Sequence, residues 1–465
     1  MKNIKLEEFE NYIKSKKVAI IGLGVSNIPL IDYMHEKGAL VTVFDQNEKE
    51  AFSEDVINKL EKYNFKFIGG KDNLKELNGF DIIFRSPSCL PTRPELEAEA
   101  KRGAIITTEI EMLIKMAPCK IIGITGTEGK TTTSSIIYAI IKESGAKCYL
   151  GGNIGTPLFT KLKEMETNDI IVLEMSSFQL MGMEVSPNIA LVTNIFPDHL
   201  NVHSSYQEYQ DAKKSIFKHQ KQDELVVLNY DNEITRSFKD EANGNVVFFS
   251  SKEKLENGYI YDEKDGYIKL CENGTMKNII NKNEIKLRGV HNYENICAAL
   301  AVTASIADTN TQVNAIKNFI GVEHRLEFVR EIDGVKYYND SIGTSPASTI
   351  AGLNAFDENI ILLAGGADKD LDYTEIGKKI AEKVSTLVLC GPTSDKIEDA
   401  TKKALGENSI NVFRVKNMEE AVKTARRNAK PGDIVLLSPA STSFDLYKNF
   451  AERGNVFKEI VCKMN

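Results

Sequence analysis

A loop between a predicted strand and a predicted helix carries residues suited to binding phosphate groups. The apolar run Ile121–Thr125 predicts the strand, Gly126–Gly129 form the loop, and Lys130 begins the helix. Glycines let backbone N–H groups close around phosphate oxygens, and a helix N-terminus adds a favourable potential. Lys130 can neutralise terminal phosphates, and the hydroxyl of Thr131 can ligate Mg²⁺. The pattern favours ATP or GTP binding.

The strict spacing of the P-loop motif is not met in this loop. Ile124 stands five residues before Gly129, where GxxxxGK[ST] requires a glycine. A glycine turn followed by a surface lysine is therefore the alternative. The placement between a strand and a helix favours nucleotide binding.

Three further groups could extend this chemistry. Glu174 ends a predicted strand, where a carboxylate would face the phosphates and complete an Mg²⁺ shell, although an ordinary strand-end glutamate is the simpler interpretation. His199 follows another strand and could hold a second metal ion, although a lone histidine is more often a surface or core residue. Lys213 and Lys214 lie in a helical stretch, and composition distinguishes neither of them from a solvated face.

The elements that must position these residues alternate between strand and helix in three segments. Such alternation predicts an α/β fold with parallel sheets, whose ligands bind at the carboxyl ends of the strands. We expect domains at residues 1–108, 109–320 and 321–465, with short antiparallel strands between Glu224 and Leu287. The expected parallel strands are Val18–Ile21, Leu40–Phe44, Asp81–Phe84, Ile121–Thr125, Ile170–Glu174, Ala190–Ile195, Val335–Asn339, Ile360–Ala364, Thr386–Cys390 and Asp433–Ser438.

The composition agrees with several domains of a globular protein. The chain has 465 residues, and single cores stop growing at about 250–300 residues. With 58 basic and 66 acidic residues the net charge is −8, which argues against a nucleic-acid surface. No apolar run approaches the roughly 20 residues of a membrane helix, and the N-terminus lacks a signal-peptide core. Seven scattered cysteines without a CxxC pair indicate reduced, mostly buried thiols in the cytoplasm.

The first segment contains a second glycine-rich turn, Gly22-Leu23-Gly24-Val25-Ser26-Asn27. It resembles a GxGxxG dinucleotide fingerprint in which Asn27 replaces the third glycine. From this motif alone an NAD site is the usual interpretation, but a helix N-terminus suits any diphosphate.

Taken together, these motifs resemble those of the Mur ligase family of peptidoglycan synthesis over essentially the whole chain. The resemblance implies three α/β domains: a Rossmann-like UDP-binding domain, a central P-loop ATPase-like domain with a mostly parallel sheet, and a C-terminal Rossmann-like domain. The segments that carry it are Gly126–Thr132, Gly151–Gly155, Glu174–Leu180, Asp198-His199, His291–Asn295, His324-Arg325, Asn339–Ser341 and Ser438–Phe450.

The resemblance implies an ATP-dependent ligase that activates a carboxylate as an acyl phosphate. It implies UDP-N-acetylmuramoyl-L-alanine and D-glutamate as substrates, two Mg²⁺ ions, and a CO₂-derived carbamate on Lys213. We expect a monomer without a nucleic-acid or membrane partner. Another Mur-type amide ligase with a different amino acid is the nearest alternative, and a nucleotide switch and an NAD-dependent dehydrogenase are more distant ones.

The implied roles can be assigned residue by residue. Catalysis would involve Lys130, His199, Lys213 and Glu174, of which the last three together with Thr131 would hold the metal ions. ATP would contact Gly126, Thr127, Gly129, Lys130, Thr131, Thr132, Asn295, Arg325 and Asp340. The UDP would lie near Ser26, Asp45 and Ser86, and the muramoyl group near Asn153, Ser176 and Gln179. The incoming glutamate would meet Thr344, Lys369, Ser443, Phe444 and Phe450.

Some positions depart from the family pattern or allow a simpler interpretation. Glu128 replaces a common asparagine in the phosphate loop, and Ile342 replaces a common lysine, which removes one expected cation. Without the resemblance, Ser443 would be interpreted as a turn residue and Phe450 as a core residue.

Overall fold

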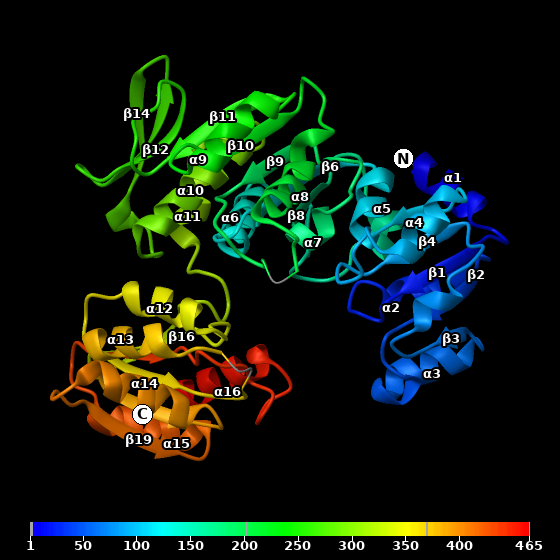
Figure 1. The fold of residues 1–465 in the computed structure, drawn as a ribbon. Coiled ribbons are helices and arrows are strands. Elements are labelled where there is room, and N and C mark those ends of the chain that lie inside the picture. Colours follow the sequence, from blue (N-terminus) through cyan, green and yellow to red (C-terminus); the bar gives the residue numbers. More distant parts are fainter. Residues whose placement is uncertain (1–2, 201, 369–370, 465) are drawn as a thin grey trace. The chain divides into compact units, whose positions relative to one another are not determined.

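The computed structural model describes residues 3–200, 202–368 and 371–464, and their strands form three separate sheets (Figure 1). The chain divides into two compact units, residues 1–285 with 290–318, and residues 286–289 with 319–465. The first two sheets belong to the first unit and the third sheet to the second. The domain boundaries at 108/109 and 320/321 remain predictions, because the first of them falls inside one compact unit.

The first sheet has five parallel strands in the order β3-β2-β1-β4-β5. Strand β1 pairs with both β2 and β4, so the chain order reverses on either side of it. In open α/β sheets, ligands bind at such a switch point, beyond the carboxyl ends of the strands. The elements are α1 (Ile4–Tyr12), β1 (Lys17–Ile21), α2 (Ile28–Glu36), β2 (Leu40–Phe44), α3 (Glu54–Lys62), β3 (Lys66–Ile68), β4 (Ile82–Arg85), α4 (Pro94–Lys101), β5 (Ile105–Thr107) and α5 (Glu109–Met116).

The second sheet has nine strands in the order β14-β13-β12-β11-β10-β9-β6-β8-β7. Strand β6 lies between β8 and β9 and is parallel to both, so the loops that follow these three strands meet at one edge. The elements are β6 (Lys120–Thr125), α6 (Lys130–Glu143), β7 (Cys148–Gly152), β8 (Ile170–Glu174), α7 (Ser177–Leu180), β9 (Ile189–Val192), α8 (Tyr206–Lys218), β10 (Leu225–Asn229), α9 (Glu233–Ser237), β11 (Asn245–Ser250), β12 (Gly258–Asp262), β13 (Tyr267–Glu272), β14 (Thr275–Asn281), α10 (Val290–Thr303) and α11 (Thr309–Asn318).

The expectation of antiparallel strands throughout residues 224–287 was wrong for the first part of that stretch. Strands β10 and β11 continue the parallel sheet, and β12 pairs in parallel with β11. Only β12, β13 and β14 form antiparallel pairs. The run Val226–Leu228 is fully buried, as in a strand covered on both faces, and α9 supplies a crossover to β11.

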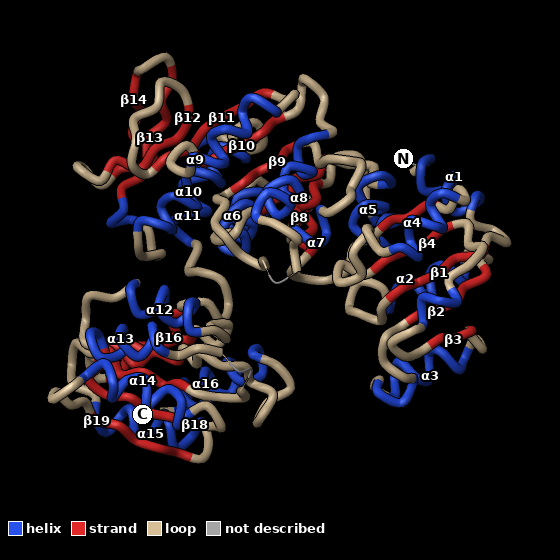
Figure 2. Tube along the Cα trace, in the orientation of Figure 1, coloured by secondary structure: helices blue, strands red, loops and turns tan. Residues whose placement is uncertain are grey.

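The third sheet has six strands in the order β15-β16-β20-β17-β18-β19 and is parallel except for the β15–β16 pair. Helices cover both of its faces (Figure 2). Leu362 and Leu436 pack in a core with Ile376 of α13, whereas Leu363 and Val435 pack in another with Val422 of α15. The elements are β15 (Glu327–Ile332), β16 (Val335–Asn339), α12 (Pro346–Asn354), β17 (Ile360–Ala364), α13 (Thr374–Lys383), β18 (Val384–Cys390), α14 (Ser394–Leu405), β19 (Asn411–Val415), α15 (Met418–Asn428), β20 (Ile434–Leu437) and α16 (Phe450–Lys463).

One apolar core joins the first two sheets. Phe159, which begins a short 3₁₀ helix after β7, is fully buried. Its ring lies 6.0 Å from that of Phe9, 5.3 Å from that of Tyr33 and 6.4 Å from that of Phe84, measured between centroids. Glu109 accepts hydrogen bonds from the backbone N–H groups of Leu158 (3.2 Å) and Phe159 (2.9 Å). The end of the loop that leaves β7 is therefore fixed both by aromatic packing and by hydrogen bonds to Glu109.

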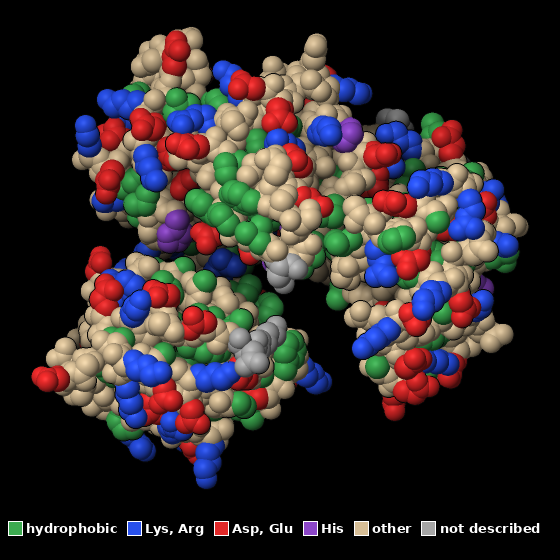
Figure 3. Space-filling model, in the orientation of Figure 1, with side chains coloured by type: hydrophobic (Ala, Val, Ile, Leu, Met, Phe, Trp, Pro, Cys, Tyr) green, Lys and Arg blue, Asp and Glu red, His purple; other side chains and the backbone are tan. Residues whose placement is uncertain are grey.

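The molecular surface mixes charges of both signs. Acidic and basic side chains are interspersed over the face shown in Figure 3. Among the described residues, no helix has both the length and the apolar character needed to cross a membrane. All seven cysteines have free thiols, but Cys119, Cys271 and Cys297 are the buried ones, so the expectation of mostly buried thiols was wrong.

Candidate active site

The loop between β6 and α6 has the backbone of a phosphate-binding loop. Gly126 and Gly129 have φ angles of +146° and +79°, a region that side chains rarely adopt. A Cβ atom at Gly126 would come within 1.9 Å of the hydroxyl oxygen of Thr193. The Nζ atom of Lys130 donates to the carbonyl oxygens of Gly126 (3.0 Å) and Thr127 (2.8 Å). The lysine predicted to hold phosphates thus lies folded over the loop.

Residues after β9 brace this loop. The backbone N–H of Thr127 donates to the carbonyl of Asn194 (2.8 Å), and that of Glu128 donates to Oδ1 of Asn194 (2.8 Å). The hydroxyl of Thr193 donates to the carbonyl of Glu128 (2.6 Å). These bonds fix Glu128 through its backbone, while its side chain is exposed. A glutamate at position 128, where the family commonly has asparagine, is therefore compatible with the geometry of the loop.

Asn295 of α10 contacts the same loop from the other side. Its Oδ1 atom accepts a hydrogen bond from the hydroxyl of Thr133 (3.1 Å), and a Cβ atom at Gly129 would come within 2.5 Å of it. This predicted ATP contact is thus next to the phosphate loop. Asn194 and Thr193 were not predicted as site residues, although both follow the same strand as His199.

Gly129 offers a test of this close approach, with Gly145 as a matched control. Both residues have left-handed φ angles, +79° and +83°, but a Cβ atom at Gly145 would meet nothing within 4 Å. Replacing either by alanine is expected to lower the free energy of unfolding by about 1–2 kcal/mol. Only Gly129→Ala should also weaken Mg·ATP binding, by about tenfold or more. Urea unfolding and calorimetric titration measure the two effects, and equal ATP affinities would contradict the prediction.

A buried carboxylate next to the phosphate loop provides a site for a hard cation. Glu174, at the end of β8, is 1% exposed. Its Oε2 atom accepts from the hydroxyl of Thr131 (2.7 Å), and its Oε1 atom accepts from the amide of Asn153 (2.8 Å). Oxygen atoms of a carboxylate and a hydroxyl are the ligands that Mg²⁺ prefers, so the two predicted metal ligands fit the ion. Asn153 holds the carboxylate in place.

Lys213 and Lys214 lie in different environments. Lys213 is 2% exposed, and its Nζ atom donates to the carbonyl of Gly126 (2.8 Å) and to the hydroxyl of Thr125 (3.3 Å). Lys214 instead forms surface ion pairs with Asp211 (3.2 Å) and Glu241 (2.7 Å). The structure therefore selects Lys213 as the lysine at the phosphate loop.

The environment of Lys213 favours its uncharged form. Burial, followed by the positive charge of Lys130, lowers the pKa of Lys213 well below its usual value. The Nζ atom of Lys213 lies 4.8 Å from the ring centroid of Tyr209, whose hydroxyl is 2.9 Å from that of Thr127. Tyr209 was not predicted, although it lies one helical turn before Lys213.

His199 is placed more openly than the other candidate ligands. It has a φ angle of +54°, and its Nε2 atom lies 3.4 Å from the carboxylate of Asp198, with both side chains about half exposed. Its ring lies 5.0 Å from that of Phe178. His203, by contrast, is buried, with its Nε2 atom 3.0 Å from the hydroxyl of Ser177.

The segment after β8 is rigidly capped. Ser176 is the N-cap of α7, and its hydroxyl accepts from the backbone N–H of Gln179 (3.3 Å). The Gln179 side chain in turn accepts from the backbone N–H of Ser176 (2.9 Å). Two of the three predicted muramoyl contacts thus belong to one capping box, shortly after Glu174.

The glycine-rich turn of the first sheet is held by polar side chains. Asp45 accepts hydrogen bonds from the backbone N–H groups of Leu23 (2.7 Å) and Asn47 (2.9 Å). The Asn27 amide donates to the carbonyl oxygens of Ile21 and Gly22, both at 3.0 Å. Asn27 therefore stabilises the turn where the fingerprint has a third glycine.

The predicted UDP contacts lie around this turn. A Cβ atom at Gly22 would come within 2.6 Å of the hydroxyl oxygen of Ser86, so the loop after β4 packs directly on the turn. Ser26 and Ser86 are both partly exposed, whereas Asp45 is buried. Asp45 thus supports the turn, and the two serines are accessible to a ligand.

The second unit holds Arg325 on an unusual turn. His324 and Leu326, on either side of it, have φ angles of +63° and +45°, and the Arg325 side chain is exposed. Asp340 is buried and accepts from the backbone N–H of Leu326 (3.2 Å) and from the hydroxyl of Ser438 (2.6 Å). Burial raises the pKa of Asp340 to about 6. Asp340 therefore supports the turn that presents Arg325.

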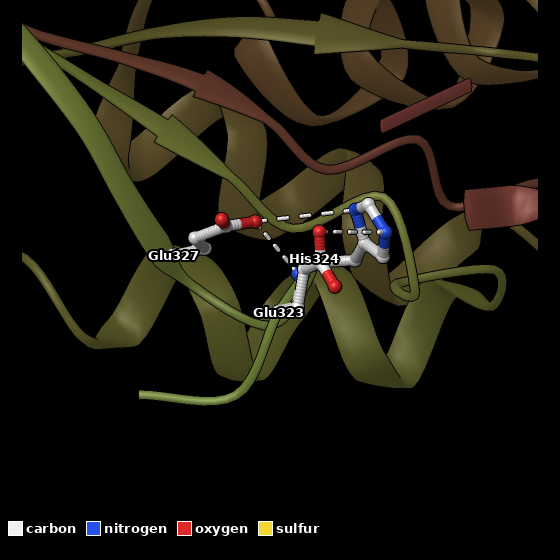
Figure 4. Close-up of side chains that lie close together, drawn as sticks. All are labelled: Glu323, His324 and Glu327. Carbon is white, nitrogen blue, oxygen red and sulfur yellow. Dashed lines mark hydrogen bonds and ion pairs between the residues drawn. The ribbon is translucent and has the colours of Figure 1, made fainter. Parts of the chain in front are cut away.

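Glu323, His324 and Glu327 lie close together at this turn (Figure 4). The carboxylate of Glu327 accepts from the backbone N–H of His324 (2.8 Å). The ammonium of Lys458 forms ion pairs with both glutamates, at 3.1 Å to Glu327. Because a cation from the chain already lies between the carboxylates, we interpret the cluster as a brace for the turn.

The residues predicted for the glutamate pocket also lie in the second unit. Phe444 and Phe450 are 67% and 36% exposed, which contradicts the interpretation of Phe450 as a core residue. Ser443 is buried, and its carbonyl accepts from the backbone N–H groups of Leu446 and Tyr447, so it does form a turn. Thr344 is partly exposed, near Ile342. Lys369 lies outside the described residues.

The chain belongs to the Mur ligase family. Three family models match it in sequence: the MurD-like N-terminal domain at residues 16–108, the Mur ligase middle domain at 124–303, and the glutamate ligase domain at 324–441. Together these matches span most of the chain and agree with a fold of three α/β domains.

Two relatives that share one name match almost the full length of the chain. The chain is 47% identical to UDP-N-acetylmuramoylalanine–D-glutamate ligase of Clostridium acetobutylicum, with 98% of both chains covered, and 46% identical to that of Ruminiclostridium cellulolyticum, with 99% of both covered. Among solved structures, UDP-N-acetylmuramate–alanine ligase MurC of Thermotoga maritima matches with a TM-score of 0.58 at 19% identity, covering 96% of this chain and 99% of that one. MurF ligase of the same organism, in complex with ADP, matches with a TM-score of 0.55 at 18% identity, covering 98% and 97%. The solved structures establish the shared fold.

Proposed function

We propose that this protein joins D-glutamate to UDP-N-acetylmuramoyl-L-alanine with the hydrolysis of ATP to ADP and phosphate, in the synthesis of peptidoglycan precursors. The arrangement that carries the proposal is the phosphate loop with Glu174 and buried Lys213 beside it. The names of the similar ligases support the two substrates. A cytoplasmic location and a monomeric state remain predictions.

In the first step, the substrate carboxylate attacks the γ-phosphorus of ATP. An O–P bond forms, the bond to ADP breaks, and an acyl phosphate results. Lys130 and the N-terminus of α6, which begins at this lysine, stabilise the charge that spreads over the phosphoryl oxygens. Mg²⁺ held by Thr131 and Glu174 would supply further electrostatic stabilisation there.

In the second step, the unprotonated amine of D-glutamate attacks the acyl carbon. The C–N bond forms as the bond to phosphate breaks, and the amine proton is released. Asn153, Ser176 and Gln179 are proposed to orient the muramoyl end of the acceptor. Arg325 and Asp340 are proposed to contact ATP, and Thr344, Lys369, Ser443, Phe444 and Phe450 the glutamate.

We also propose that Lys213 carries a carbamate. Its neutral amine would add to CO₂ with loss of a proton, which turns a cation into an anionic oxygen ligand. Burial and the charge of Lys130 lower the pKa of Lys213 and so favour the reactive form. The carbamate and His199 are then the ligands proposed for a second Mg²⁺.

An ADP-release assay tests the proposed function. Purified protein with ATP, Mg²⁺ and UDP-N-acetylmuramoyl-L-alanine is expected to form ADP with D-glutamate but not with L-glutamate, L-alanine, glycine or a diamino acid. Release with a different amino acid would identify another amide ligase of this family. ATP left untouched under all conditions would refute the ligase proposal.

A further inference from the structure

Arg85 is a buried cation at the junction of the first two sheets. It is the last residue of β4, directly before Ser86, and is 3% exposed. Its guanidinium donates to the main-chain carbonyl of Cys89 (3.3 Å) and, from the other nitrogen, to that of Met181. Removing an arginine from water is unfavourable unless its hydrogen bonds are well placed. The two carbonyl groups that accept its hydrogen bonds therefore indicate which segments Arg85 holds together.

These partners connect two parts of the proposed site. Cys89 closes the loop that begins at Ser86, where the UDP is proposed to lie. Met181 is the C-cap of α7, whose N-cap is Ser176, near the proposed muramoyl end. One side chain of the first sheet thus holds both its own ligand loop and the acceptor helix of the second sheet.

Two further contacts hold the segment after α7, one of them to the loop after β4 and the other to α5. A Cβ atom at Gly182 would come within 3.2 Å of Cγ of Pro91, so the two loops pack closely. The backbone N–H of Glu184 donates to the buried carboxylate of Glu111 (3.3 Å). The segment after α7 is therefore tied to its surroundings at successive positions.

We propose that Arg85 is a positioning residue that sets the distance between the UDP-binding loop and α7. The inference rests on the proposed function. A sugar nucleotide that spans both sites gains affinity from binding at both ends at once, but only when the two sites are held at the matching separation. UDP alone occupies one end and gains nothing from that separation.

Calorimetric titration of wild type, Arg85→Met and Arg85→Lys with UDP and with UDP-N-acetylmuramoyl-L-alanine tests this role. Arg85→Met is expected to bind the full sugar nucleotide at least about tenfold more weakly, and UDP less than about twofold more weakly. Arg85→Lys keeps the charge but lacks the fork that reaches two carbonyls, so it should lose affinity in the same selective way. Arg93→Met, at an exposed arginine further along the same loop, is the control and should bind both ligands like wild type.

The outcomes separate this role from a general loss of structure. Equal losses for both ligands, or no loss for either, would overturn the positioning role. Urea unfolding of each variant identifies a misfolded protein. If Arg85→Met is misfolded, the affinities of Arg85→Lys for the two ligands decide whether the positioning role holds. A wild-type protein that binds neither ligand would overturn the proposed function together with this inference.

Discussion

Replacing Lys130 by alanine is expected to reduce ADP formation by about 10³-fold or more while leaving the fold intact. The Lys130 ammonium lies over the phosphate loop, within hydrogen-bonding distance of the carbonyl oxygens of Gly126 and Thr127. When ATP enters, it can exchange these carbonyls for phosphate oxygens. The charge on those oxygens is redistributed during phosphoryl transfer, so the loss should fall mainly on kcat.

The fold is expected to survive because Lys130 is the first residue of α6 and is only partly buried. Lys142→Ala removes the same charge from the exposed far end of the same helix and should leave activity unchanged. Steady-state ADP release gives the rates, and urea unfolding gives the stability of both variants. A Lys130→Ala protein with more than about a tenth of wild-type kcat would show that the lysine does not act in phosphoryl transfer.

Much of this site could be predicted because its residues follow strands of one parallel sheet. Gly126 directly follows β6, Glu174 is the last residue of β8, and Asn194 lies two residues after β9. The carboxyl ends of these neighbouring parallel strands meet at one edge. Thr131 therefore reaches Glu174, although the two are far apart in sequence. The strict P-loop spacing failed at Ile124 because that residue is still part of β6.

What could not be predicted depends on burial and on contacts distant in sequence. Adjacent helical residues point in different directions, so only the packing of α8 shows that Lys213 faces the phosphate loop. Asn27 is accommodated at the position of the third fingerprint glycine because its amide donates hydrogen bonds to two backbone carbonyls. The spacing of the motif alone does not predict these hydrogen bonds. The parallel pairing of β10 with β11 was not predicted, because α9, the helix that connects them, has only five residues and is too short to be recognised as a crossover from sequence.

Replacing Lys213 by alanine is expected to lower ligase activity by about 10²-fold or more, whereas Lys214→Ala should retain it. The two lysines are adjacent on α8, but only Lys213 contacts the phosphate loop, through Thr125 and Gly126. Because both variants lose the same side chain, a difference between their activities reports only where that side chain lies. Comparable losses in both variants would indicate a general effect on α8.

Bicarbonate and ¹³CO₂ test the carbamate itself. Only an unprotonated amine adds to CO₂, and the lowered pKa of Lys213 extends that form to lower pH than for an exposed lysine. Removing CO₂ should therefore slow the wild-type enzyme, and bicarbonate should restore it, while Lys213→Ala responds to neither. A carbamate resonance in the ¹³C NMR spectrum of wild type and of Lys214→Ala, absent from Lys213→Ala, is the expected signature. Full activity of Lys213→Ala would show that the lysine is dispensable. A wild-type enzyme that is indifferent to CO₂ and lacks the resonance would exclude a carbamate ligand and leave the lysine only a role in positioning the phosphate loop.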